Sequence, residues 1–101
     1  MARGPSLYGS QQECWICHNT YNIHVHHIYG GVGRRPISDE EGCWLYLCGP
    51  HHNQSNFGVH FDKELDKSLK MDCQRRWERR EGLEGKDAHD AFRKRFGVSY
   101  L

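Results

Sequence analysis

Two short pairs of metal-binding residue types lie far apart in the sequence. The first pair is Cys14-x-x-Cys17 and the second is Cys48-x-x-His51. Zinc prefers four tetrahedral sulfur or nitrogen ligands, and each x-x spacing lets one tight turn present two of them. The pairs therefore predict a structural Zn²⁺ site, provided that two strands form a hairpin that brings the turns together. His18 is a competing ligand, and the alternative is that Cys48 is only a buried thiol and His51 a surface residue.

A second group of residues with chemical potential is His24-Val25-His26-His27. Neighbouring side chains of a strand alternate between its faces, so His24 and His26 should share one face and His27 should point to the other. A metal-dependent phosphodiesterase needs one histidine to ligate the ion and another to take the proton from the attacking water. His26 and His27 can divide these tasks if the strand twists or ends close to them.

Taken together, these motifs resemble the HNH endonucleases of the His-Me finger, or ββα-metal, group. The nearer likeness is to short HNH proteins encoded by prophages, and it covers residues 13–101. The shared features are the segment His-His-Ile-x-Gly-Gly-x-Gly-Arg-Arg, the step Leu-Cys-x-x-His-His, a Gly-Val-His and a Tyr-Leu end. The resemblance implies a metal-dependent DNA endonuclease, encoded by a phage or prophage, that leaves a 3′-hydroxyl and a 5′-phosphate.

The resemblance also implies roles for individual histidines. His27 corresponds to the general base, and His26 and His52 correspond to ligands of a catalytic divalent metal. His60, in the Gly-Val-His step, is the expected third ligand. Asn56 competes for that role, because on a helix it would lie one turn beyond His52. The candidate ions are Mg²⁺, Mn²⁺, Ni²⁺ and Zn²⁺, and an all-histidine site favours the last three, since Mg²⁺ prefers oxygen ligands.

Basic residues near these motifs predict contacts with DNA. Arg34 and Arg35 stand in the glycine-rich segment 30–36, which we expect to be a flexible loop able to clamp phosphate through bidentate contacts. Related nucleases carry in this region an asparagine that orients the base, and no asparagine stands here, so the sequence leaves the orienting group unidentified. A second basic run contributes Arg75, Arg76 and Arg79, with Arg80 completing one band on a helix. The alternative for both groups is a solvated surface.

The elements that must position these residues follow from local patterns. We expect strands at 21–29 and 43–47, a turn at 38–42, and a helix that starts at Pro50 and extends to about Asn56. A longer helix, capped by Asp62, should run to about residue 81. The final helix should be capped by Asp87 and ended by Gly97.

Apolar residues on the two later helices should face inward. The longer helix carries an apolar stripe of Leu65, Leu69, Cys73 and Trp77, and the last helix carries Ala88, Ala91, Phe92 and Phe96. Cys43 and Cys73 are better interpreted as small core residues than as ligands. The fold class is therefore α+β, with a ββα-metal core and a zinc knuckle followed by two C-terminal helices. We expect residues 1–12 to be a flexible lead-in and 13–101 to form a single HNH nuclease-like zinc domain.

Composition agrees with a small metal-stabilised protein. The chain has 101 residues, of which 37% are hydrophobic, so a modest core should need a supplement such as bound metal. Five cysteines cannot all pair in disulfides. The sequence shows no signal-peptide pattern, and no apolar stretch approaches the roughly twenty residues that a membrane span requires. We therefore expect a cytoplasmic protein with reduced cysteines; its oligomeric state stays open.

Two other functions remain open. The chain could be a non-catalytic zinc-containing DNA-binding domain, or a small phage protein that binds a host protein. Binding alone requires no paired base and metal ligand, so His26 and His27 together with His52 favour the enzyme.

Overall fold

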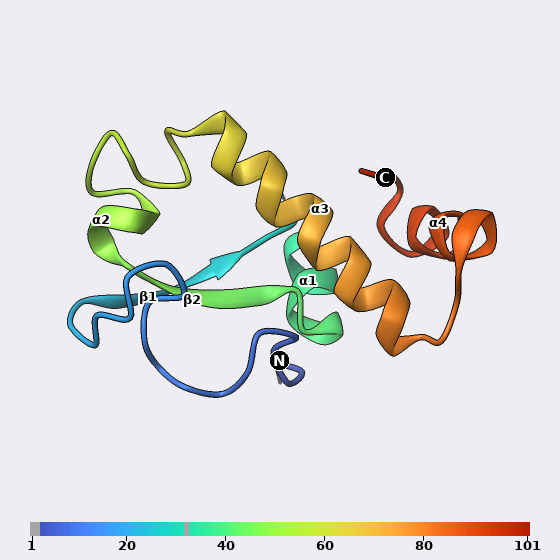
Figure 1. Cartoon of the computed structure of the whole chain (residues 1–101), viewed down its shortest axis with the longest axis horizontal. Coiled ribbons are helices and arrows are strands. Elements are labelled where there is room, and N and C mark those ends of the chain that lie inside the picture. The colour runs from blue at the N-terminus through green and yellow to red at the C-terminus, as the bar shows by residue number, and fades with distance from the viewer. Residues whose placement is uncertain (1–2, 32) are drawn as a thin grey trace.

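The computed structural model describes residues 3–31 and 33–101. Over these residues the chain forms a two-stranded sheet and four helices (Figure 1). The elements, in chain order, are β1 (Ile23–His27), α1 (Arg35–Glu41), β2 (Trp44–Cys48), α2 (Gly49–His52), α3 (Lys63–Arg80) and α4 (Gly85–Phe96). This arrangement confirms the α+β class. No helix within the described ranges is long and apolar enough to cross a membrane.

The two strands pair antiparallel, as the zinc-knuckle prediction required. Ile23 lies opposite Cys48, and His26 lies opposite Leu45. Both strands are close to their expected positions, although β1 is shorter than the predicted 21–29. The pairing places the end of β2, where α2 begins, beside the start of β1, and α2 contacts both strands.

The segment between the strands differs from the expectation. A flexible loop at 30–36 and a turn at 38–42 were expected, but residues 35–41 form the helix α1. Pro36 occupies its first turn, and Gly42 ends it with a φ of 76°, a conformation that glycine adopts without strain. Ser38 fastens the helix to the segment that follows β1, because its hydroxyl donates to Tyr29 O at 2.9 Å. Val32 of the expected loop lies outside the described residues.

The long helix α3 follows the prediction closely. Asp62 caps it by accepting hydrogen bonds from the backbone N–H groups of Glu64 and Leu65. Leu69, Cys73 and Trp77 of the expected stripe are buried, and Leu65 packs against the core while partly exposed. In Figure 1 α3 runs diagonally from the loop after α2 towards α4, which lies at the opposite end of the molecule from α2.

The last helix begins earlier than predicted. α4 starts at Gly85, so Asp87 lies in the first turn and is not the cap. Ala88, Phe92 and Phe96 are buried as expected, and Ala91 is partly buried against the core. The helix ends at Gly97, which confirms the predicted stop.

The N-terminal segment makes specific contacts that the expectation of a flexible lead-in did not include. Leu7 N donates to Gly42 O at 2.9 Å, and the Tyr8 hydroxyl donates to Asp72 Oδ2 on α3 at 2.7 Å. The guanidinium of Arg76 lies 4.2 Å from the centre of the Tyr8 ring. The described part of this segment therefore connects the turn between α1 and β2 to α3.

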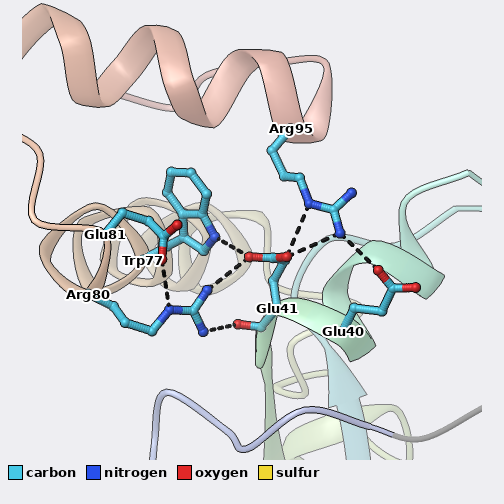
Figure 2. A network of polar contacts seen from close by, with 6 residues as sticks. All are labelled: Glu40, Glu41, Trp77, Arg80, Glu81 and Arg95. Atoms are coloured by element: carbon cyan, nitrogen blue, oxygen red, sulfur yellow. Dashed lines mark hydrogen bonds and ion pairs between the residues drawn. The ribbon is translucent and has the colours of Figure 1, made fainter.

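One carboxylate ties three helices together. Glu41, at the end of α1, accepts hydrogen bonds from Trp77 Nε1 at 2.7 Å, Arg80 Nη2 at 2.9 Å and Arg95 Nε at 3.1 Å (Figure 2). Burial raises the pKa of Glu41, but the hydrogen bonds from Trp77 and Arg95 and the charges of Arg95 and Arg80 outweigh it, so the pKa lies below its usual value. The network holds α3 and α4 against α1, and α1 in turn packs on β1.

Candidate metal centres and active site

The four residues predicted to bind zinc lie together. One donor atom each from Cys14, Cys17, Cys48 and His51 falls within 4.8 Å of the others, so this cluster could hold a metal ion such as zinc. The Cys17 and Cys48 sulfurs are 3.7 Å apart, and Cys14 Sγ is 3.6 Å from His51 Nδ1. Tetrahedral zinc with Zn–S bonds of about 2.3 Å would hold two sulfurs about 3.8 Å apart. The donor spacing therefore fits zinc.

Local hydrogen bonds explain how the knuckle forms. His18 N donates to Cys14 O at 2.8 Å and closes the tight turn, while Trp15 N donates to Tyr46 O at 2.9 Å and fastens that turn to β2. Burial raises the pKa of Cys14, but backbone N–H groups, that of Cys17 first, outweigh it and bring the pKa to about 6. A lowered pKa favours the thiolate, which is the ligand form. The competing ligand His18 is exposed and lies beside Glu13 instead.

A second cluster consists of the three histidines expected to bind the catalytic metal. One ring nitrogen each from His26, His52 and His60 lies within 4.8 Å of the others, and His52 Nε2 is 3.0 Å from His60 Nε2. His26 is almost completely buried. Its Nε2 is the single buried side-chain nitrogen or oxygen in the described part of the chain without a hydrogen-bond partner. Such an atom is costly to leave unpaired, and a metal ion would provide the partner.

The loop after α2 brings His60 to this cluster. The expected helix to Asn56 ends at His52, and the following residues turn back on it. Val59 N donates to His51 O at 2.8 Å, and His60 N donates to His52 O at 3.1 Å. The helical spacing that made Asn56 a competitor is therefore wrong, and His60 is the residue that lies against His52. Asn56 is exposed on a separate groove of the same loop.

The environment of His26 and His52 favours their neutral form. Burial, followed by the charges of His52 and His60, lowers the pKa of His26 to about 3. Burial and the neighbouring His60 and His24 lower the pKa of His52 to about 4. Neutral imidazole is the form that binds a metal, so neither His26 nor His52 would have to lose a proton near pH 7 in order to bind one.

The predicted base has a partner that the sequence analysis did not identify. His27 Nε2 lies 2.8 Å from Asp39 Oδ1 on α1. His27 and Arg35 line the same hollow as the three clustered histidines. Asp39 was missed because its segment was expected to be a turn. The signals for α1, Pro36 and Gly42, were nevertheless present in the sequence.

Two of the arginines predicted to contact DNA make contacts within the protein. Arg34 Nε donates to Phe96 O at 3.0 Å, at the end of α4. Arg76 pairs with Asp72 at 2.8 Å and donates to Leu7 O at 3.2 Å. Arg80 of the same band likewise binds Glu41 in the network of Figure 2. Of the predicted band of four arginines, Arg76 and Arg80 are therefore engaged in contacts within the protein.

The other arginines predicted to contact DNA fall in two places. Arg35 is exposed beside the histidine cluster, and Lys63, which the sequence analysis did not single out, lines an adjoining hollow with His27 and His60. Arg75 and Arg79 are exposed and line a groove near the end of α3. At 1.5 Å per helical residue, Arg75 lies about 18 Å farther along α3 than Lys63.

Comparisons of this chain with protein-family models, with curated proteins and with solved structures found no match. The two clusters and the contacts around them are therefore the features of this protein that bear on its function.

Proposed function

We propose that this protein is a metal-dependent DNA endonuclease of the HNH type, in which β1, β2 and α2 form the ββα-metal core. The observation that carries the proposal is the unpaired, buried His26 Nε2. His26 belongs to a cluster of three histidines, and the next residue, His27, is held by a carboxylate. A purely structural role for His26 would leave this nitrogen without a partner, whereas metal-assisted hydrolysis uses both histidines.

The contact between His27 and Asp39 defines the chemistry of the base. With its Nε2–H donated to Asp39, a neutral His27 has its lone pair on Nδ1, which can accept a proton from water. The ring becomes positively charged when it takes that proton, and the Asp39 carboxylate at 2.8 Å stabilises the charge. Asp39 is itself held by Arg3 at 3.1 Å, which fixes the carboxylate for this role.

His26, His52 and His60 are the residues that would hold the ion. A divalent metal bound there supplies positive charge that stabilises the phosphate and the leaving oxygen during hydrolysis. Arg35 and Lys63 stand on either side of the cluster in adjoining hollows. Their charges would attract the phosphates that flank the scissile bond, and bidentate contacts from Arg35 would orient one of them.

A non-catalytic DNA-binding domain with a zinc knuckle is the second candidate. The exposed side chains of Arg75 and Arg79 favour it, since they form a basic surface away from the histidines. A function limited to DNA binding assigns no chemical role to the contact between His27 and Asp39. The third possibility, a protein that binds a host protein, has no specific observation in its favour.

A plasmid-nicking assay with purified protein tests the proposal. Protein that carries only its structural zinc is supplied with Mg²⁺, Mn²⁺, Ni²⁺ or Zn²⁺, and conversion of supercoiled plasmid to nicked circles is followed on gels. We expect cleavage with at least one ion and none when that ion is omitted. His52→Ala should weaken both binding of this ion and cleavage, because it removes a ligand.

The matched variant Asp39→Asn keeps the size of the side chain but removes its charge. We expect it to slow cleavage while binding of the ion stays unchanged, because the Asp39 carboxylate bonds to His27 and Arg3 and to none of the three clustered histidines. Duplex binding without cleavage under every metal condition would support the DNA-binding alternative and contradict the nuclease.

A further inference from the structure

A chain of hydrogen bonds leads away from the histidine cluster on the side opposite to His60. His52 Nδ1 lies 2.9 Å from His24 Nδ1, and His24 Nε2 lies 3.1 Å from Asn22 Oδ1. Asn22 Nδ2 in turn donates to Gln54 Oε1 at 2.6 Å. We propose that this relay fixes the hydrogen of His52 on Nδ1, so that its Nε2 lone pair faces the metal, and that His24 is a positioning residue and not a ligand.

The direction of each hydrogen bond follows from the donors and acceptors available. Because Asn22 donates its amide N–H to Gln54, its oxygen is the atom that faces His24. An oxygen can only accept, so His24 carries its hydrogen on Nε2, and the Nδ1 of a neutral ring is then an acceptor. His52 must therefore donate from Nδ1, which leaves its Nε2 without hydrogen. This single assignment satisfies every hydrogen bond of the relay.

The other side of His52 agrees with this assignment. Its Nε2 lies 3.0 Å from His60 Nε2 within the cluster, so Nδ1 and Nε2 of His52 serve different partners. The hydrogen bond from His24 meets His52 at Nδ1, and the ring of His24 stands nearly perpendicular to that of His52, at an interplanar angle of 83°. Metal-bound histidines commonly donate their second N–H to an outer partner, which fixes the ring and raises its basicity. Here that partner is another histidine.

The inference rests on the proposed metal site but not on DNA cleavage, so metal binding can test it directly. Protein that holds one zinc per chain is titrated with Ni²⁺ by calorimetry. His24→Phe keeps a ring but removes the acceptor, and we expect Ni²⁺ affinity to fall about 10- to 100-fold, the usual loss for such partners. His24→Asn places an oxygen where Nδ1 stood, so it should retain an affinity close to that of the wild type.

Two further readouts separate positioning from general damage. Long-range ¹H–¹⁵N spectra of the nickel-free protein should show His52 protonated on Nδ1 in the wild type and in His24→Asn, and a mixture of tautomers in His24→Phe. Asn22→Gly removes the oxygen that accepts the hydrogen bond from His24 without changing either histidine, and glycine suits the φ of 51° at that residue. It should also mix the tautomers of His24 and lower Ni²⁺ affinity.

Different results of these experiments would overturn different parts of the proposal. Unchanged Ni²⁺ affinity and an unchanged His52 tautomer in His24→Phe would overturn the relay while leaving the metal site and the nuclease proposal intact. Equal, large losses in His24→Phe and His24→Asn, with no effect of Asn22→Gly, would make His24 a ligand and also overturn it. A wild-type protein that binds no Ni²⁺ or other divalent ion beyond its zinc would overturn both the relay and the proposed function.

Discussion

Replacing Gly58 by alanine tests how the loop after α2 positions His60. A Cβ atom at residue 58 would lie 2.7 Å from His52 O and 2.8 Å from Pro50 O. Favourable contacts between non-bonded atoms begin at about 3.5 Å, so the loop would have to move by about 0.7 Å or more. Both close atoms belong to the backbone of α2, so no side-chain rotation relieves the overlap.

The displacement acts on two hydrogen bonds that hold the loop, Val59 N to His51 O at 2.8 Å and His60 N to His52 O at 3.1 Å. Each such bond contributes about 0.5–1.5 kcal/mol, so Gly58→Ala should lower the free energy of unfolding by about 1–3 kcal/mol. His60 moves with the loop, and each reduction of about 1.4 kcal/mol in the free energy of metal binding lowers the affinity tenfold. We therefore expect Ni²⁺ affinity at the histidine cluster to fall about tenfold or more.

Urea unfolding and Ni²⁺ titration measure the two effects, and zinc content should remain one ion per chain. Gly33→Ala is the matched control, because a Cβ atom there meets no atom within 4 Å, and it should behave as the wild type. If Gly58→Ala binds Ni²⁺ as tightly as the wild type, the loop does not position His60 and the reasoning is refuted.

Three other predictions concern the zinc knuckle, the helix network and the basic surface. Metal analysis should find about one tightly bound zinc per chain, and Cys48→Ser should unfold the domain, because structural zinc contributes folding energy directly; a folded, zinc-free variant would refute the site. Glu41→Gln should lower the free energy of unfolding near pH 7 by about 1.5–3 kcal/mol, since it weakens hydrogen bonds that depend on a charged group. The folded-state pKa of Glu41 lies below its ordinary value of 4.5. The contribution of Glu41 to the free energy of unfolding is therefore fully present above pH 4.5 and is lost as the pH falls through the folded-state pKa. A difference in unfolding free energy between Glu41→Gln and the wild type that stays constant down to about pH 3 in urea titrations would contradict this. Exchange of both Arg75 and Arg79 for glutamine should reduce the log–log salt dependence of duplex binding by about 0.9 for each phosphate that is no longer neutralised, and an unchanged slope would mean that they form only a solvated surface.

Both groups of clustered residues could be predicted from the sequence, the Cys and His of the knuckle from residue type and spacing, and His26, His52 and His60 from the family resemblance. The x-x spacing of Cys14 and Cys17 is a local property, and it needs only one long-range condition, the strand pairing, which the structure meets. The apolar stripe of α3 could also be predicted from local sequence, because a spacing of four residues places Leu69 and Cys73 on the same face of any helix.

The contacts that support those ligands depend on packing and could not be predicted in this way. Asp39 reaches His27 only because α1 forms and lies against β1, and the sequence analysis expected a turn there. His24 bonds to His52 because α2 lies against β1, an arrangement that residue spacing does not specify. Arg76 could not be recognised as structural without Tyr8, which lies far from it in the sequence.

The most direct test of the proposed catalytic centre is the rate at which His27→Ala nicks supercoiled plasmid at a saturating concentration of the activating metal. The proposed role of His27 predicts a rate about 10²–10⁴-fold below that of the wild type, the usual contribution of a general base. Metal affinity should be nearly unchanged, because His26, His52 and His60 remain in place. Nicking by His27→Ala at the wild-type rate would contradict the proposed mechanism.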